Sequence, residues 1–161
     1  MVDGRLIERR TSRRASRVAG RVLARLACEC ERTGEAEIYA GDLGYQCFRG
    51  RPDLVRRATM TIVRRERLAD LPIVDPEHMP IAADLAVEVV APSQLEYELV
   101  EKVRDLLTGG FAAVWVIHPN VRTVTVYRAG NAHPVTLGIA DEITAEPALT
   151  LFHCPVAAFF E

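Results

Sequence analysis

The segment DLAVEVV at residues 84–90 constrains the fold more than any other part of this chain. Its apolar and β-branched residues predict a buried strand at the centre of a sheet. Glu88 interrupts the apolar run, and an ionised carboxylate among apolar side chains is costly unless a partner or a metal ion stabilises it. We therefore expect this strand to carry a functional acid.

A helix is expected directly after this strand. Pro92 ends the strand, and Ser93 and Glu96 have the S-x-x-E spacing of a capping box at a helix N-terminus. The helix is predicted to run to about Leu107, because the pair Gly109–Gly110 follows it.

This helix carries Lys102, the only lysine in the chain. Leu95, Leu99 and Leu106 define the predicted apolar face of the helix, and Lys102 falls on the same face. A lysine that points toward a core needs a carboxylate partner or a catalytic task. Because the helix folds back onto the sheet, we expect Lys102 to approach Glu88.

A long amphipathic helix is predicted at residues 12–32, with Thr11 or Ser12 as the N-cap and Gly34 near its end. At 100° per residue its two sides differ in chemistry. The apolar side contains Ala15, Val18, Ala19, Val22, Leu23 and Leu26, and the opposite side contains Arg10, Arg14, Arg17, Arg21 and Arg25.

The charges are unevenly distributed along the chain. Residues 1–67 contain 16 Arg and 9 acidic residues, whereas residues 68–161 contain 3 Arg, one Lys and 13 acidic residues. The basic half suits contact with nucleic acid, and Arg14, Arg17 and Arg21 are the candidate DNA contacts. Two other interpretations remain open: a solvated helix face, and attraction between the two halves within a monomer or across a dimer.

The remaining strand patterns complete a mixed α/β fold, with one sheet flanked by helices, in a single domain covering residues 1–161. The predicted strands are EIYA (37–40), YQCF (45–48), ATMTIV (58–63), AAVWVIHP (112–119) and TVTVYR (123–128).

Composition favours a cytoplasmic protein. The sequence has no apolar run of membrane-spanning length, and its first ten residues do not resemble a signal peptide. The cysteines are therefore expected to be reduced thiols. A zinc site that uses His153 and Cys154 is an alternative, but it lacks the spacing of a known zinc motif. The cysteines are Cys28, Cys30, Cys47 and Cys154.

Glu88 and Lys102 together suit metal-assisted hydrolysis of phosphodiesters. The carboxylate would hold Mg²⁺, and the lysine would act on the attacking water or on the developing charge. Asp84 is a further candidate metal ligand, although it lies about 13 Å from Glu88 along the strand, too far for both to chelate one ion directly. A structural ion pair without a catalytic role is the alternative.

Nearly the whole chain resembles the Uma family of putative restriction endonucleases, which belong to the PD-(D/E)xK nuclease superfamily. Residues 83–128, from ADLAVEVVAPS through EKV and AAVWVIHP to TVTVYR, are similar to the family's PDLVVEVLSPS, its EK-bearing helix, VWLVDP and a TV-x-VYR strand. The resemblance implies a restriction-endonuclease-like core that hydrolyses DNA with Mg²⁺ or Mn²⁺. It assigns the acidic metal ligand to Glu88 and the catalytic lysine to Lys102.

The chain departs from the family pattern at the first metal-binding acid. Where the family has Pro–Asp, this chain has Ala58–Thr59, and the neutral hydroxyl of Thr59 removes one charged oxygen ligand. Asp53, Asp84 or Glu77 are candidates to replace it, although the RPD at residues 51–53 lies too early to be the motif. His118 and Ala91 also replace family residues, an Asp and a Ser.

Two functions remain open from the sequence: a metal-dependent endonuclease with a degraded site, and a catalytically inactive nuclease-fold module for nucleic-acid binding or protein assembly. The resemblance also makes a homodimer plausible. Apolar side chains of TVTVYR (123–128) and VAAFFE (156–161) are the expected interface candidates.

Overall fold

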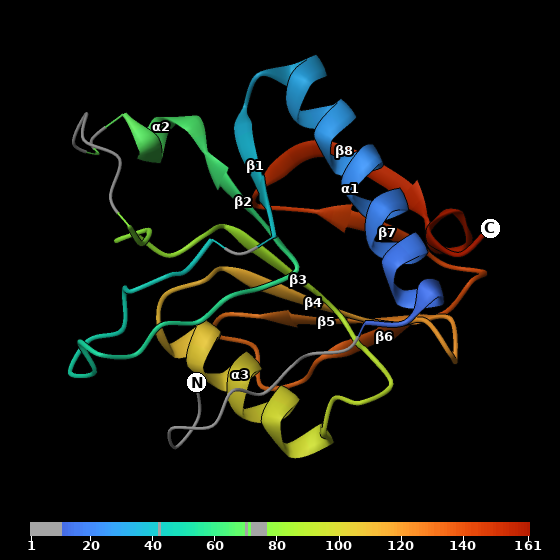
Figure 1. The fold of residues 1–161 in the computed structure, drawn as a ribbon. Coiled ribbons are helices and arrows are strands. Elements are labelled where there is room, and N and C mark those ends of the chain that lie inside the picture. The colour runs from blue at the N-terminus through green and yellow to red at the C-terminus, as the bar shows by residue number, and fades with distance from the viewer. Residues whose placement is uncertain (1–10, 42, 70, 72–76) are drawn as a thin grey trace.

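The fold is a mixed α/β arrangement in a computed structural model that describes residues 11–41, 43–69, 71 and 77–161. These residues form a six-stranded sheet in the order β1-β2-β3-β4-β5-β6 and a smaller sheet of β7 and β8 (Figure 1). The elements are α1 (Arg13–Thr33), β1 (Ala36–Ala40), β2 (Met60–Arg64), α2 (Arg65–Leu68), β3 (Leu85–Val89), α3 (Glu96–Thr108), β4 (Ala113–His118), β5 (Thr123–Arg128), β6 (Val135–Leu137), β7 (Glu142–Ala145), β8 (Leu149–Pro155) and the 3₁₀ helix η1 (Val156–Phe159).

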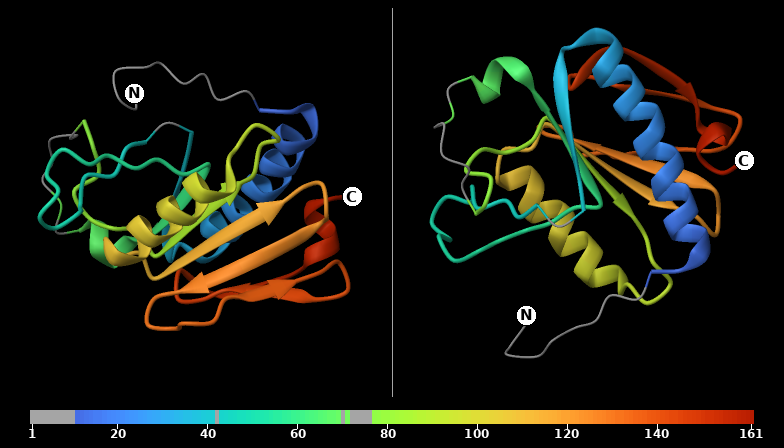
Figure 2. Two further views of the ribbon diagram at one scale, coloured as in Figure 1. Left: turned by 90° about the horizontal axis from the view of Figure 1, so that it is seen from below. Right: turned by 45° about the horizontal axis from the view of Figure 1, so that its top comes forward.

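The strand order confirms that the apolar strand after Asp84 is central. In the large sheet, β3 runs antiparallel to its neighbour β2 and parallel to its other neighbour, β4. Parallel neighbours need a crossover connection, which α3 supplies. Helices α1 and α3 cover opposite sides of this sheet (Figures 1 and 2).

Helix α1 has the boundaries and polarity that its sequence predicts. The Ser12 hydroxyl accepts a hydrogen bond from the Ala15 amide at 3.1 Å, and Gly34 ends the helix with φ 68°. This left-handed conformation suits glycine, which has no Cβ to clash. The apolar side of α1 is buried against the large sheet, the small sheet and η1, whereas Arg10 lies outside the described residues.

Helix α3 begins later than predicted, and Ser93 is not its N-cap. Residues 91–94 make a turn closed by a 3.0 Å bond from the Gln94 amide to the Ala91 carbonyl, with Pro92 at its second position. The turn uses the residues that would have formed the first helical turn, so Leu95 becomes the N-cap. Leu95 is 51% exposed and does not belong to the apolar face.

The predicted strand at residues 45–48 is wrong. Tyr45 forms two isolated bridges, to Arg56 and Met79, within an irregular segment that crosses the α3 side of the sheet. The Tyr45 ring enters the core, and its hydroxyl lies 2.6 Å from the Thr61 hydroxyl. The segment therefore packs on the face of the sheet and does not extend its edge.

The surfaces expected at a dimer interface are largely buried within the chain. Val124 and Val126 of β5 pack in the core, as do Val156, Phe159 and Phe160 at the C-terminus. The expected exposed apolar surfaces are therefore wrong, because the small sheet and η1 cover this side of the core. No helix in the described residues is long and apolar enough to cross a membrane.

We predict that Gly109→Ala destabilises the fold by about 1–3 kcal/mol, the usual cost of overpacking. A Cβ at Gly109 would lie 2.5 and 2.6 Å from two ring carbons of Phe48. The matched control is Gly20→Ala in α1, where nothing lies within 4 Å; it should stabilise the protein by about 0.5–1 kcal/mol. Urea unfolding measures both changes, and an unchanged stability in Gly109→Ala would contradict the close packing.

Candidate functional site

The candidate site is built on Glu88, near the carboxyl end of the central strand β3. Alternate residues of β3 point to opposite faces. Leu85, Val87 and Val89 therefore enter the α1 core, whereas Ala86 and Glu88 face the α3 side. Glu88 is 5% exposed, so its carboxylate depends on partners within the protein.

Helix α3 brings Lys102 to this carboxylate. The Lys102 Nζ atom lies 2.7 Å from Glu88 Oε2, and Lys102 is 3% exposed. Leu99 and Leu106, on the same side of the helix, are also buried and belong to the same core as Ala86 and Val116 of the sheet. The predicted approach of Lys102 to Glu88 is therefore confirmed, whereas a catalytic role for the two residues stays a prediction.

The second oxygen of Glu88 faces the turn that precedes α3. The Gln94 side-chain amide donates a hydrogen bond of 3.4 Å to Glu88 Oε1. Gln94 is half-buried, so this partner of the carboxylate is partly open to solvent. Because α3 starts late, residues 91–94 form a turn, and this turn contributes the Gln94 hydrogen-bond donor to the site.

Thr59 immediately precedes β2 and contacts the backbone next to Glu88. The pairing of β2 with β3 ends at Met60 and Val87, so Thr59 lies just beyond that pair, on the side of Glu88. Its hydroxyl accepts a 3.0 Å hydrogen bond from the Val89 amide. The position where the resemblance places the first acid is thus beside Glu88, but it presents a neutral side chain.

The other candidate ligands are not brought to Glu88. Asp84, at the far end of β3, accepts hydrogen bonds from the Arg67 side chain at 2.9 Å and the Arg64 amide at 2.8 Å. Asp53 and Glu77 are exposed in loops. Among the described residues, no three His, Cys, Asp or Glu side chains are grouped so that they could hold a metal ion.

The alternative zinc site is not supported either. His153 Nε2 lies 2.7 Å from a Glu142 carboxylate oxygen, and all four cysteines are free. Burial raises the pKa of the Cys154 thiol, which disfavours the thiolate that a metal requires. His118 is half-buried at the end of β4, where it pairs with Thr123.

Sequence reasoning missed a second buried charge on α3. Asp105 is 2% exposed and accepts hydrogen bonds from Arg51, at 2.7 Å, and from Arg56. Burial alone would raise the pKa of Asp105, but the hydrogen bonds and charges of Arg56 and then Arg51 hold that pKa below its ordinary value. The sequence signal that could have revealed Asp105 was an acidic residue one helical turn after Lys102. In the RPD segment at residues 51–53, it is Arg51 that makes a buried contact, whereas Asp53 is exposed.

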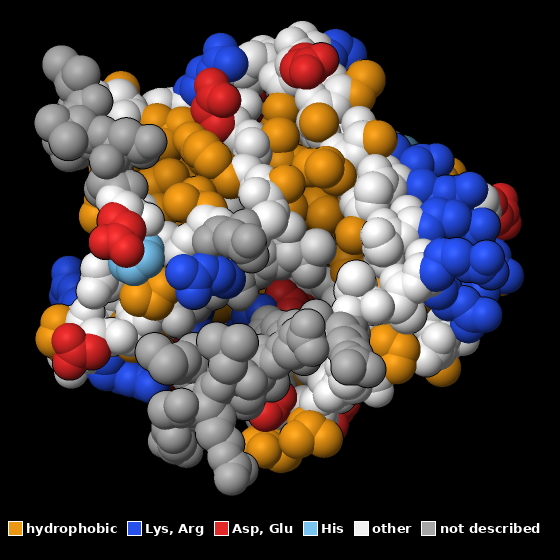
Figure 3. Space-filling view, viewed as in Figure 1, with side chains coloured by type: hydrophobic (Ala, Val, Ile, Leu, Met, Phe, Trp, Pro, Cys, Tyr) orange, Lys and Arg blue, Asp and Glu red, His pale blue; other side chains and the backbone are white. Residues whose placement is uncertain are grey.

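Arginine side chains gather over α1 on the face shown in Figure 3. Arg14 and Arg17 are exposed; their guanidinium groups donate to the Asn120 side chain at 3.2 Å and to the Phe160 carbonyl at 3.3 Å. Arg21 is half-buried, and its Nη1 atom is covered. A guanidinium group has five N–H donors, so these contacts leave donors for a phosphate.

The first turn of α1 lies at the same edge of the sheet as the candidate site. Both views in Figure 2 show the connection between β3 and α3 close to the start of α1. The bond from Arg14 to Asn120 links this turn to the loop after β4. A ligand that contacts Arg14 would therefore lie near the turn that contains Gln94.

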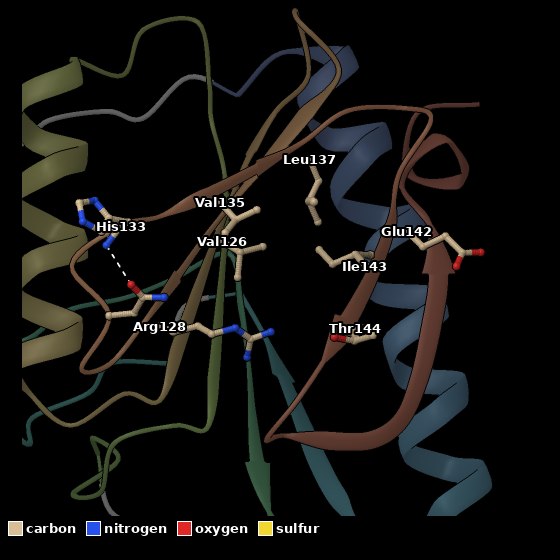
Figure 4. Close-up of a pocket in the computed structure, with 9 residues that line it drawn as sticks. Val126, Arg128, His133, Val135, Leu137, Glu142, Ile143 and Thr144 are labelled. Carbon is tan, nitrogen blue, oxygen red and sulfur yellow. Dashed lines mark hydrogen bonds between the residues drawn. The ribbon is translucent and has the colours of Figure 1, made fainter.

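A surface hollow of about 210 Å³ lies elsewhere, between β5, β6 and β7 (Figure 4). Arg128 in this hollow donates to the Glu146 carbonyl at 2.6 Å, and the His133 amide donates to the Asn131 side chain at 3.0 Å. Glu142 points away from Arg128 in this view. The hollow contains neither Glu88 nor Lys102 and is separate from the candidate site.

We predict that Glu88→Ala costs about 3–5 kcal/mol in the free energy of unfolding, because it removes the carboxylate beside a buried ammonium group. The double variant Glu88→Ala/Lys102→Met should recover most of this loss. Glu37→Ala, which breaks an exposed ion pair with Arg65, is the control and should cost at most about 1 kcal/mol. Denaturant unfolding measures all three, and equal effects of Glu88→Ala and Glu37→Ala would contradict the buried pair.

Comparison with known proteins supports the nuclease interpretation of the fold. The chain is similar to the crystal structure of a putative nuclease belonging to DUF820 from Anabaena variabilis ATCC 29413, with a TM-score of 0.82 and 17% identity. The match covers 99% of this chain and 87% of that chain, and at this identity it shows a shared fold. No curated protein matches. The model of the Uma2 family, described as "Putative restriction endonuclease", matches residues 1–157, so the chain belongs to this family.

Proposed function

We propose that this nuclease-fold protein binds DNA and that its Glu88–Lys102 pair is the retained part of a phosphodiester-hydrolysing site with weakened metal affinity. The observation that carries this proposal is the buried 2.7 Å contact between the chain's only lysine and Glu88, with the Thr59 hydroxyl bonded to the amide of the next residue, Val89. Membership of the Uma2 family supports the choice of a nucleic-acid substrate.

The described residues do not fit a complete Mg²⁺ or Mn²⁺ site. Hard cations are held by several oxygen ligands, and carboxylates supply most of the binding energy. Glu88 supplies one carboxylate, which is already bonded to Lys102, and Thr59 adds a neutral hydroxyl that accepts from Val89. Metal binding by Glu88 is therefore expected to be weak.

Lys102 and Glu88 retain a chemical capacity of their own. The ammonium group of Lys102 can donate hydrogen bonds to phosphate oxygens and stabilise their negative charge. Glu88 fixes the position of that ammonium group, and the half-buried Gln94 contacts the other oxygen of the same carboxylate. The pair is thus suited to recognising a phosphodiester even where hydrolysis is slow.

DNA binding is assigned to the exposed arginine side of α1. Arg14 and Arg17 lie at the end of the helix that is near the candidate site, and Arg21 lies one turn further along. Lys and Arg neutralise DNA phosphates and release counterions, so contacts of this kind give binding that weakens steeply with salt.

The second candidate is an active metal-dependent endonuclease that cleaves DNA phosphodiester bonds. The close Glu88–Lys102 contact favours it, because both residues keep the arrangement that the family resemblance assigns to metal binding and catalysis. It requires acidic ligands that the described residues do not bring to Glu88.

Thr59→Asp distinguishes the two candidates. We predict that it raises Mg²⁺ and Mn²⁺ affinity at least about tenfold in a calorimetric titration, because it restores an anionic oxygen beside Glu88. Thr59→Asn, which has a similar shape without the charge, is the control. Unchanged affinity in Thr59→Asp would show that this position is not where a ligand is missing.

The same variants should be assayed for nicking of supercoiled plasmid with Mg²⁺ or Mn²⁺. The leading proposal expects little nicking by the natural protein and a gain in Thr59→Asp. Metal-dependent nicking by the natural protein that Lys102→Ala abolishes would instead establish the second candidate.

We predict that Arg14→Gln/Arg17→Gln weakens binding to duplex DNA and lowers the slope of log affinity against log salt by about 2, since each phosphate contact contributes nearly one unit. The control Arg32→Gln/Arg13→Gln removes the same number of charges. Arg32 lies in the last turn of α1 and is paired with Glu29, so it should not contact DNA. We therefore expect this control to lower the salt slope by no more than half as much as Arg14→Gln/Arg17→Gln. Equal slopes for both double variants would remove the case for Arg14 and Arg17.

A further inference from the structure

A second buried charge lies on α3 one turn beyond Lys102. The side chain of Asp105 is 3% exposed, and it is bonded to Arg51 and Arg56 from the irregular segment between β1 and β2. These arginines are 51% and 23% exposed, so they reach inward from the surface to a carboxylate on the helix. A buried carboxylate is costly without such partners, so the arginine contacts hold this side of α3 in place.

The two buried charges on α3 bind partners on different elements. Positions 102 and 105 differ by about 60° around a helix and by about 4.5 Å along its axis. Lys102 binds Glu88 in the sheet, whereas Asp105 binds arginines of the segment that covers the sheet. A rotation of α3, or a slide along its axis, would break both sets of contacts at once. Apolar packing alone is less directional, because apolar contacts do not depend on the alignment of donors and acceptors.

The arginine segment is itself attached to β2, the strand that follows Thr59. The backbones of Arg56 and Tyr45 exchange hydrogen bonds of 2.8 and 3.1 Å. The Tyr45 hydroxyl contacts Thr61 on β2, two residues from Thr59, and its ring packs against Phe111 at 5.1 Å between centroids. Contacts therefore run from β2 through Tyr45, Arg56 and Asp105 to α3.

The end of α3 is fixed by the same segment. The ring of Phe48 packs so closely against Gly109 that a Cβ there would meet ring carbons at 2.5 Å. The Gly109 amide donates to the Asp105 carbonyl at 2.8 Å. The segment thus contacts α3 at two neighbouring points, one charged and one apolar.

We propose that Asp105, held by Arg51 and Arg56, is a positioning residue that sets the orientation of α3 and so keeps Lys102 against Glu88. Its importance for activity rests on the proposed function, whereas its effect on the Lys102 contact does not. Asp105 is not assigned any contact with substrate.

The only lysine of the chain makes this contact directly measurable. Protein grown with lysine labelled by ¹⁵N at the side-chain nitrogen gives a single side-chain ammonium signal, from Lys102. Exchange of its protons with water reports whether the bond to Glu88 persists. This signal can be observed in the full chain without metal or DNA.

Asp105→Leu is the decisive variant, because leucine has the same branched shape as aspartate but carries no carboxylate and is apolar. We expect Lys102 ammonium exchange to accelerate at least about tenfold, the size expected from the loss of one charge-assisted hydrogen bond. Asp84→Leu is the matched control: it also removes a buried carboxylate bonded to an arginine, but it lies outside α3. In Asp84→Leu, the exchange of the Lys102 ammonium protons should not change beyond what the lost free energy of unfolding accounts for.

Two further variants keep the test informative if Asp105→Leu does not fold. Arg56→Gln should accelerate exchange more than Arg51→Gln, because Arg56 is the less exposed partner and donates through two nitrogen atoms. Unchanged Lys102 exchange in the folded variants would overturn the proposal. Acceleration that follows lost stability equally in the Asp105 and Asp84 variants would also overturn it, since that describes a general structural role.

The outcome is separable from that of the proposed function. If the natural protein shows no DNA binding while Asp105→Leu loosens Lys102, the proposed function fails and the positioning role stands. If DNA binding persists with Lys102 exchange unaffected by Asp105→Leu, the positioning role alone is rejected.

Discussion

The contact between Lys102 and Glu88 is the interaction on which the candidate site depends. It joins the central strand β3 to the crossover helix α3 at 2.7 Å, with both side chains buried. Neither charge is tolerable there alone, because the cost of removing an ion from water is offset only by a close partner of opposite sign. The contact therefore ties the chemistry of the site to the packing of the helix on the sheet.

Helix α3 differs from a simple apolar crossover because it buries one positive and one negative side chain. Lys102 binds the sheet beneath it, and Asp105 binds arginines from the segment that covers the same side of the sheet. Charge-assisted hydrogen bonds require alignment as well as proximity. Two such sets on one helix restrict its orientation more narrowly than Leu99 and Leu106 could by packing alone.

The same strand pairing that presents Glu88 also explains why its metal affinity is expected to be low. Thr59 lies just before β2, and its hydroxyl accepts a hydrogen bond from the amide of Val89, the neighbour of Glu88. A carboxylate at this position would add a formal charge next to Glu88; the threonine instead completes a local hydrogen bond. A neutral hydroxyl is a weaker ligand for a hard cation than a carboxylate, which is why low metal affinity is expected.

The sequence by itself determined several elements and indicated the central contact. Periodicity predicted α1, β3, β4 and β5 closely, because these elements depend on neighbouring residues along the chain. The inward-facing position of Lys102 on its helix and the family resemblance indicated the pair with Glu88. Only the tertiary structure decided the start of α3, the path of residues 45–58 and the partners of Asp84 and Asp105. A turn at Pro92 competes with the capping box, and Tyr45 packs on the face of the sheet. Arg51 and Arg56 meet Asp105 from about fifty residues away, and no local pattern records which distant side chains share a buried space.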